Sequence, residues 1–358
     1  MADYKKRRAG VLRYLEERGL DGALITSYEN RRYFCGFTGS LGYLLITRDG
    51  ARMVVDMRYT TQAREQAAGT EIIEYRRDRL GTVAKMIRDT GVRRLALESS
   101  LTLEEYFPLK EKMGDTEIVP EREYFTEQRM VKEPEELAAI RAAIRCAETA
   151  FAQTVSMMKP GMTEKDIADE FAYRASRAGA DRLAFDTIVG SGPRGALAHA
   201  FPTGRVIENG DMVVCDLGVF MDGYCSDMTR TVLFGDVSPA HRRIFDLVQE
   251  SQDAAFAAVR PGVNAIEVEN AHRIPFLREG LDDYALRGLG HGIGLEIHEC
   301  PRVQIGVENT VLAPGMVFTL EPGLYFPGEC GVRTEDDVLV TETGVENLSA
   351  TPHEIRVG

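Results

Sequence analysis

The chain repeats a short pattern of residues at an offset close to 100 positions. Gly190-Ser191-Gly192 is followed by His199-Ala200-Phe201-Pro202, and Gly290-His291-Gly292 is followed by His298-Glu299-Cys300-Pro301. A duplicated half-domain places equivalent groups face to face across a pseudo-twofold axis. Because the groups that recur here are histidines and carboxylates, which are common metal ligands, we expect a metal site close to that axis.

Longer stretches follow the same duplication and predict its secondary structure. Residues 212–218 match 316–323 with one residue inserted, and 159–163 match 260–264. Pro134 suits the first position of a helix, and Lys159-Pro160-Gly161 ends it, after which Thr163 caps a second helix. A helix that begins at Ser238-Pro239 and ends at Arg260-Pro261-Gly262 repeats this plan. β-rich segments follow each helical pair, so residues 126–358 predict a duplicated α+β domain.

The first part of the chain has a different pattern. Short apolar runs at 23–25, 43–46, 53–55 and 94–97 alternate with helical patterns at 59–68, 80–89 and 103–113. This alternation predicts an α/β domain. The change of pattern falls near Phe125 to Glu133, so we predict one domain over residues 1–125 and a second over 126–358.

Charge and composition exclude several classes of function. The 358 residues include 43 basic and 56 acidic side chains, for a net charge of −13, which makes nucleic acids and anionic membrane surfaces poor partners. No apolar stretch is long enough to span a membrane. The six cysteines lack a Cys-x-x-Cys spacing and indicate buried thiols in a reducing cytoplasm.

Two predicted β-hairpins would bring four carboxylates together. In the first hairpin, a turn at Met221-Asp222 would put Asp216 opposite Asp227, and a turn at Asp222-Gly223 would still leave both on one face of the sheet. In the second, Glu321 and Glu335 are symmetric about Gly328, so a turn of three or five residues pairs them on one face. Carboxylates in such positions repel one another unless a cation lies between them.

One histidine completes this ligand set. His291 lies within Gly290-His291-Gly292-Ile293-Gly294, where glycines let the backbone approach a site closely. Four carboxylates and one imidazole suit two divalent ions that share bridging carboxylates and activate a water molecule. Ser191 stands where His291 stands in the other copy, so only the second copy supplies nitrogen.

These residues resemble the pita-bread metallopeptidases, in the branch of Xaa-Pro dipeptidase (prolidase) and Xaa-Pro aminopeptidase. The resemblance is strong over residues 126–350, and it extends more weakly to the first domain, which would be a creatinase-like N-terminal domain. The segments that carry it are Asp216-Leu217-Gly218, Tyr224-Cys225-Ser226-Asp227-Met228-Thr229-Arg230, Gly290-His291-Gly292-Ile293-Gly294, Glu321-Pro322-Gly323 and Val332-Arg333-Thr334-Glu335.

The resemblance implies a role for each candidate residue. Asp216 would bind one metal ion, His291 and Glu321 the other, and Asp227 and Glu335 would bridge the two ions. His199, His298 and Glu335 would be catalytic. The histidines would stabilise an oxyanion or protonate the departing proline nitrogen, and Glu335 would accept the proton of the attacking water.

Two arginines are candidates for the substrate side of the site. Arg302 lies four residues after His298, where a prolidase arginine binds the free carboxylate of a dipeptide. Arg333 is grouped with it as a substrate-binding candidate, and the resemblance points more specifically to an arginine that orients a carboxylate beside Glu335.

The activity implied is hydrolysis of the bond before a proline at the second position of a dipeptide or short peptide. A prolidase-like dipeptidase is favoured, with an Xaa-Pro aminopeptidase acting on longer peptides as the alternative. A catalytically inactive, metal-free scaffold is a third hypothesis. Manganese is the favoured metal, with cobalt, iron and zinc left open. Relatives are commonly dimeric, so a homodimer in the cytoplasm is expected.

Overall fold

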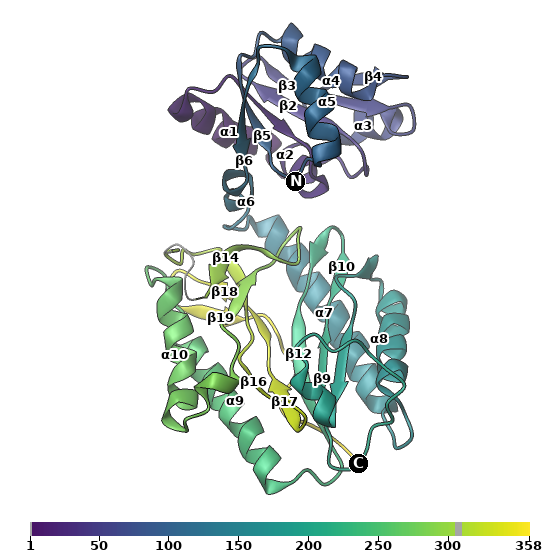
Figure 1. The fold of residues 1–358 in the computed structure, drawn as a ribbon, viewed down its shortest axis with the longest axis vertical. Coiled ribbons are helices and arrows are strands. Elements are labelled where there is room, and N and C mark those ends of the chain that lie inside the picture. The colour runs from purple at the N-terminus through teal and green to yellow at the C-terminus, as the bar shows by residue number, and fades with distance from the viewer. Residues whose placement is uncertain (1, 305–309) are drawn as a thin grey trace. The chain divides into compact units, whose positions relative to one another are not determined.

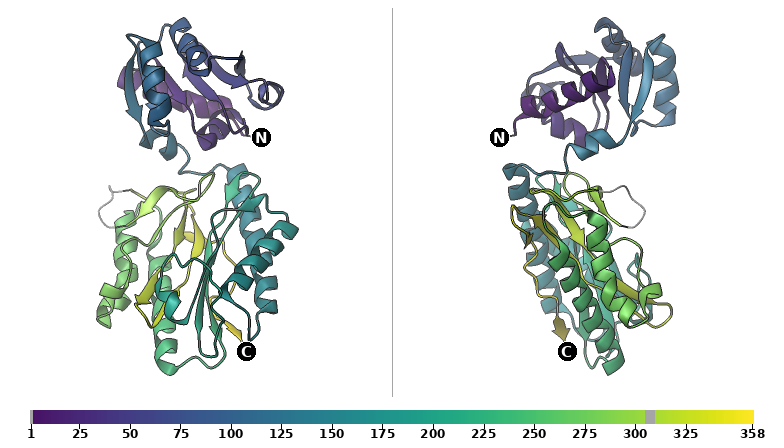
Figure 2. Two further views of the ribbon diagram at one scale, coloured as in Figure 1. Left: turned by 45° about the vertical axis from the view of Figure 1, so that its right-hand side comes forward. Right: turned by 90° about the vertical axis from the view of Figure 1, so that its left-hand side faces the viewer.

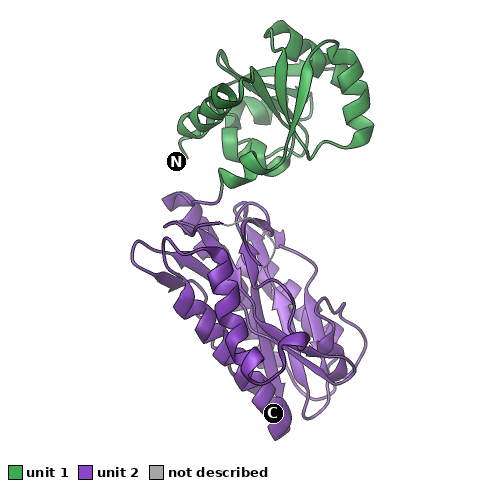
Figure 3. Cartoon of the chain, turned by 60° about the vertical axis from the view of Figure 1, so that its left-hand side comes forward, with its two compact units in different colours: residues 1–129 green, residues 130–358 purple. Residues whose placement is uncertain are grey.

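The computed structural model describes residues 2–304 and 310–358, which form two compact units (Figure 3). Unit 1 is Met1–Arg129 and unit 2 is Met130–Gly358. The division lies a few residues beyond the expected boundary between residues 125 and 126. Each unit has hydrophobic clusters of its own.

Unit 1 is built on one mixed sheet (Figure 1). Its strands are β1 (Gly22–Ile25), β2 (Tyr43–Thr47), β3 (Gly50–Asp56), β4 (Thr70–Tyr75), β5 (Arg94–Glu98) and β6 (Glu117–Glu121). Its helices are α1 (Tyr4–Arg18), α2 (Tyr28–Cys35), α3 (Thr60–Gln66), α4 (Arg79–Asp89), α5 (Leu103–Met113) and α6 (Glu123–Glu127). The strand order is β4-β3-β2-β1-β5-β6, in which β2 runs antiparallel to its two neighbours and the other pairs are parallel.

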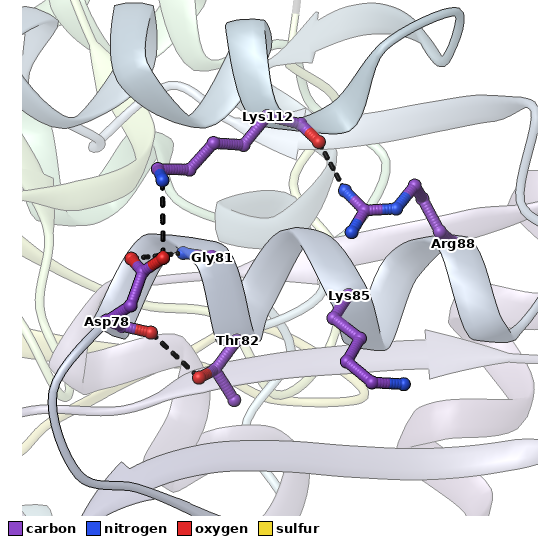
Figure 4. Close-up of a pocket in the computed structure, with 6 residues that line it drawn as sticks. All are labelled: Asp78, Gly81, Thr82, Lys85, Arg88 and Lys112. Carbon is purple, nitrogen blue, oxygen red and sulfur yellow. Dashed lines mark hydrogen bonds and ion pairs between the residues drawn. The ribbon is translucent and has the colours of Figure 1, made fainter.

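Apolar side chains of the helices pack on this sheet, as the alternation of strands and helices predicts. Ile87 of α4 and Leu109 of α5 join Leu24 and Val54 of the strands in one buried cluster. An open depression lies at the surface between α4 and α5 (Figure 4), and two of its charged groups form an ion pair. Lys112 contacts the Asp78 carboxylate at 3.2 Å, and Asp78 also caps α4. None of the candidate site residues lines this depression.

Unit 2 begins with a pair of helices followed by strands, and then repeats that order. The first half comprises α7 (Pro134–Met157), α8 (Glu164–Ala178), β7 (Arg182–Leu183), β8 (Ile188–Ser191), η1 (Gly192–Ala196), β9 (Met212–Leu217), β10 (Val219–Met221), β11 (Tyr224–Cys225) and β12 (Met228–Phe234). The second half comprises α9 (Pro239–Ala258), α10 (Ala265–Arg278), η2 (Asp282–Tyr284), β13 (Gly290–Gly292), β14 (Glu299–Val303), β15 (Val317–Leu320), β16 (Gly323–Phe326), β17 (Cys330–Arg333) and β18 (Asp336–Val340). Strands β19 (Val345–Asn347) and β20 (Ile355–Val357) close the chain.

The two halves share a sheet plan, which confirms the duplicated α+β domain. Strand order is β20-β12-β9-β8 in the first sheet and β14-β13-β15-β18-β19 in the second, so β9 and β12 correspond to β15 and β18. Both central pairs are antiparallel. In Figures 1 and 2, α7 and α8 flank the strands of the first half, and α9 and α10 flank those of the second.

The helices of unit 2 begin where capping chemistry predicts. Pro134 is the first residue of α7, Thr163 caps α8 in a capping box with Asp166, and Ser238 caps α9. Their apolar faces pack on the sheets. Phe151 of α7, for example, lies in one buried cluster with Val213 of β9 and Val232 of β12.

No helix in the described part of the chain is long and apolar enough to cross a membrane. All six cysteines are free thiols, and Cys300 is the most accessible of them.

Candidate metal centre

A two-residue turn sets the register that brings the first two carboxylates together. Met221 pairs with Tyr224, so the turn is Asp222-Gly223, and both residues have positive φ (49° and 85°), as in a type I′ hairpin. The same register continues into β9 and β12, where Asp216 pairs with Thr229. Asp227 lies two residues before Thr229, so Asp216 and Asp227 share one face of the sheet. This is the second of the two predicted registers.

A three-residue turn sets the register of the other two carboxylates. Phe326 pairs with Cys330, and further along the same hairpin Leu320 pairs with Asp336. This register places Glu321 opposite Glu335, between the paired segments. Gly328 lies at the centre of the turn with φ of 79°. The shorter of the two predicted turns is therefore the one that forms.

His291 comes from β13, whose glycines allow close backbone approach. A Cβ atom on Gly290 would lie 1.9 Å from the carbonyl oxygen of Thr319, and one on Gly292 would lie 2.1 Å from that of Cys300. Neither position can hold a larger residue unless the strands move apart. The close packing of β13 between β14 and β15 fixes the imidazole beside the carboxylates.

The five candidate ligands converge on one volume. His291 Nε2 lies 3.5 Å from Glu321 Oε1 and 3.7 Å from Asp227 Oδ2. Asp227, His291 and Glu335 each offer a ligand atom, and these atoms lie within 4.8 Å of one another. One oxygen of Asp216 and one of Asp227 are buried without a hydrogen-bond partner among the described residues. Buried, unpartnered carboxylate oxygens at this spacing fit divalent cations.

Burial and mutual repulsion shift the pKa of these groups. Burial, followed by the charges of Glu335 and Asp216, raises the pKa of Asp227 well above its usual value. Burial and the charges of Glu321 and Asp216 do the same for the pKa of Glu335, and burial raises the pKa of Glu321 to about 7. The negative charges are therefore unfavourable by themselves, and cations would compensate them.

His291 is prepared to act as a neutral ligand. Burial, with a contribution from His298, lowers the pKa of His291 to about 3. Its Nδ1 lies 3.2 Å from the carbonyl oxygen of Gly292, which assigns the ring proton to Nδ1. The lone pair of Nε2 then faces Asp227 and Glu321, as a metal ligand requires.

Arg333 contacts the cluster and is nearly fully buried. Its NH2 group contacts Asp216, its Nε donates to Thr229 Oγ1 at 3.0 Å, and its NH1 donates to Tyr325 Oη at 2.9 Å. Thr229 Oγ1 in turn donates to Glu335 Oε2 at 2.6 Å. These contacts favour a role in orienting Asp216 and Glu335 over direct contact with a substrate.

The remaining candidates lie around the cluster. The rings of His298 and His291 are 4.2 Å apart between centroids, and both His298 and His199 are exposed. His199 is close enough to Asp216 for its charge to lower the pKa of that carboxyl, against the larger effect of burial. Arg302 pairs with His291 across β13 and β14, and its charge acts on His291 and Glu321. The structure thus brings all nine predicted residues to one region.

Four residues that support the cluster were not predicted. Thr229 and Tyr325 bind Arg333, Thr319 Oγ1 accepts from the His291 amide at 3.2 Å, and buried Asp337 accepts from the Asp227 amide at 3.1 Å. Strand periodicity could have identified two of them, because Thr229 follows Asp227 by two residues and Thr319 precedes Glu321 by two residues. Nothing in the sequence gives Asp337 a role.

Comparison with known proteins agrees with this fold and donor set. The model of metallopeptidase family M24 matches residues 138–342, and that of the creatinase/prolidase N-terminal domain matches residues 7–131. The chain is 34% identical to an Xaa-Pro dipeptidase of Pyrococcus furiosus over 98% of this chain and 99% of the relative.

Solved structures give the same picture. An Xaa-Pro dipeptidase from Bacillus anthracis superimposes with a TM-score of 0.95 at 35% identity, covering 99% of this chain and 100% of that one. An X-Pro aminopeptidase from Thermotoga maritima superimposes with a TM-score of 0.88 at 34% identity, covering 98% and 100%.

The duplicated fold, with five ligand-type side chains converging in unit 2, defines a metallopeptidase. More particularly, the chain belongs to metallopeptidase family M24, with a creatinase/prolidase N-terminal domain ahead of the catalytic domain.

Proposed function

We propose that this enzyme hydrolyses the peptide bond between an N-terminal residue and a following proline, with dipeptides as the preferred substrates. The observation that carries the proposal is the convergence of Asp227, His291 and Glu335, with ligand atoms within 4.8 Å of one another, beside Asp216 and Glu321. The names of relatives across the whole chain support the same substrate class.

The five side chains fit two divalent ions. Asp216 would hold one ion, His291 and Glu321 the other, and Asp227 and Glu335 would bridge them. Bound there, the ions supply Lewis acidity and make water a nucleophile near neutral pH. We propose manganese as the metal, and the preference of oxygen-rich sites for hard cations supports it, with cobalt, iron and zinc as the other candidates.

The protein's own residues supply proton transfer and orientation. Glu335 would accept the proton of the attacking water, held in place by the hydrogen bond from Thr229. His199 and His298 would donate to the developing oxyanion and to the departing proline nitrogen. Burial and the charge of Arg302 lower the pKa of His298, so its ring is neutral near pH 7 and donates through one nitrogen.

Arg302 would select dipeptides. Its pairing with His291 across β13 and β14 supports this role, because a guanidinium beside the cluster would offer a fork of donors to the free carboxylate of the second residue. A longer peptide has no carboxylate at that point. The alternative, an Xaa-Pro aminopeptidase, is supported by the similarity to the Thermotoga maritima structure and predicts that Arg302 has no such role.

The test compares Ala-Pro with Ala-Pro-Ala after chelation and reloading with single metals. The proposal expects faster cleavage of Ala-Pro, restored best by manganese, and expects Arg302→Met to slow Ala-Pro selectively. Faster cleavage of Ala-Pro-Ala, unaffected by Arg302→Met, would establish the aminopeptidase. No bound metal by elemental analysis after reconstitution, together with no hydrolysis, would leave the inactive scaffold.

We also propose that the enzyme is a cytoplasmic homodimer. The free, mostly buried thiols support a reducing compartment. Light scattering coupled to size-exclusion chromatography tests the dimer, and a mass of one chain would refute it.

A further inference from the structure

The segment that carries His199 is held by one buried carboxylate. Glu164, the first residue of α8, has a relative exposure of 0%. Its Oε1 accepts from the amide and hydroxyl of Ser191, both at 2.9 Å, and its Oε2 accepts from the amide and hydroxyl of Thr203 at 3.0 and 2.7 Å. Glu164 therefore connects the start and the end of residues 191–203, the segment in which His199 is exposed.

Arg194 strengthens this attachment from within the segment. Its Nε lies 3.0 Å from Glu164 Oε2, and its NH2 donates to the carbonyl oxygen of Phe201 at 2.6 Å. Burial raises the pKa of Glu164, but the hydrogen bonds from Thr203 and Ser191 together outweigh burial. The net shift of the pKa is downward, so the carboxylate is ionised. An ionised acceptor gives the stronger, charge-assisted form of each bond.

The segment that carries His298 is attached in an equivalent way by a different residue. Glu299 directly follows His298 and forms an ion pair with Lys132, and each side chain is 1% exposed. Lys132 is fixed in turn, because its amide donates to the carbonyl oxygen of Gly315 at 2.8 Å. A Cβ atom on Gly294 would lie 2.4 Å from Glu299 Oε1 and 3.0 Å from Lys132 Nζ, so the start of this segment closes tightly over the pair.

The two halves of the repeat thus share one arrangement of histidine and glutamate. Each places an exposed histidine on a connecting segment, where side chains are otherwise mobile, and each anchors that segment through a buried carboxylate. Burying an unpaired charge costs several kcal/mol. A buried glutamate is therefore expected only where its partners compensate that cost. Glu164 and Glu299 occupy different positions within their halves and bind different partners. The two anchors are therefore not copies of one residue of the duplicated sequence.

We propose that Glu164 and Glu299 are positioning residues, which hold His199 and His298 at the distance from the carboxylate cluster that catalysis requires. This inference rests on the proposed peptidase function for its kinetic consequences only. Small displacements of a catalytic group reduce rate strongly, so loss of an anchor should act on kcat more than on KM.

The test uses Glu164→Gln and Glu299→Gln, which keep side-chain shape and remove the charge. We expect kcat for Ala-Pro to fall roughly 10- to 100-fold with metal content unchanged. The matched control is Glu269→Gln, because Glu269 of α10 is also fully buried and forms its ion pairs with His272 and Arg273 of its own helix, at 3.5 and 3.8 Å. Its variant should lose stability and keep kcat.

Double variants separate positioning from a general effect on folding. In a His199→Ala background, Glu164→Gln should change kcat less than about twofold, because the group that it positions is already absent. The same holds for Glu299→Gln with His298→Ala. An equal fall of kcat in both backgrounds, or an equal fall in the Glu269→Gln control, would overturn the proposal.

An NMR measurement tests the inference independently of activity. Proton–nitrogen spectra of the histidine rings should show dispersed signals for His199 and His298 in the native protein. In Glu164→Gln, the His199 signal alone should move to the position of a freely rotating ring, and in Glu299→Gln the His298 signal alone. Unchanged signals would refute positioning even if the native enzyme proved inactive on Xaa-Pro peptides.

Discussion

Asp227 illustrates, at the scale of a single residue, the conflict between stability and metal binding. It is buried, one of its oxygens lacks a partner among the described residues, and burial with the charges of its neighbours raises its pKa. We expect Asp227→Asn to lower activity by at least about 100-fold, since even the partners of ligands contribute 10- to 100-fold. Metal content should fall with it.

The same substitution should stabilise the metal-free protein, because asparagine avoids the cost of either charging or protonating a carboxyl group at this buried, repelling position. We expect its free energy of unfolding in EDTA to rise by roughly 1–2 kcal/mol, measured by urea denaturation. Asp222→Asn is the control, because Asp222 lies in the exposed turn of the same hairpin. A metal-free Asp227→Asn protein less stable than native would contradict the account.

Because the pKa of Glu321 is raised to about 7, the stability of the metal-free protein should depend on pH. Its usual value is 4.5, so between these values the folded metal-free protein binds a proton that the unfolded chain does not. Stability of the metal-free protein should therefore increase as pH falls from 7 towards 4.5, by up to about 1.4 kcal/mol per pH unit for each such group.

Urea denaturation at pH 7.5, 6.5 and 5.5 in EDTA measures this dependence. The metal-loaded protein is the control and should show the opposite trend, because protons compete with the metal for the same carboxylates. If the metal-free protein instead loses stability on acidification over this range, the pKa values of these carboxyl groups are not raised in the folded protein.

At the scale of secondary-structure elements, the ligand positions follow from two turns. The sequence left two alternatives open for each turn, Met221-Asp222 or Asp222-Gly223 for the first and three or five residues about Gly328 for the second, and every alternative puts the paired carboxylates on one face. Strand period then decides which carboxylates share a face. The attachments through Glu164, Asp337 and Arg230 could not be predicted, because they join side chains distant in the sequence and depend on how the elements pack.

Arg230 supports a prediction about the last element of the chain. This buried arginine of β12 donates to the carbonyl oxygens of Glu335, Thr351 and Pro352, at 2.6, 2.7 and 3.1 Å, and pairs with Asp336. Deleting residues 350–358 would leave part of a buried guanidinium without acceptors, so we expect a loss of about 3–5 kcal/mol and weaker metal binding.

The matched control deletes only residues 355–358. This removes strand β20, which pairs with β12 at Val232 to Phe234, and keeps the carbonyl acceptors of Arg230. Thermal denaturation and metal titration should show a smaller loss for the shorter deletion. Equal losses would indicate that the strand pairing, and not Arg230, accounts for the effect.

At the scale of the whole molecule, the candidate site lies within one unit. All five candidate ligands, both histidines and both anchoring glutamates lie in unit 2, whereas unit 1 has a core of its own around Leu24, Val54 and Ile87. Ligand binding stabilises only the cooperative unit that holds the site. Metal should therefore act on the unfolding of unit 2 and leave that of unit 1 nearly unchanged.

Calorimetry of the full chain tests this confinement. At a free manganese concentration 100 times the Kd, binding contributes about 2.7 kcal/mol. For a unit of 150–250 residues this corresponds to an increase in Tm of roughly 5–11 °C. We expect one transition to move by that amount and the other to stay, and Asp227→Asn to abolish the movement. A single transition that moves as a whole would contradict this expectation, because metal bound in unit 2 would then also stabilise unit 1.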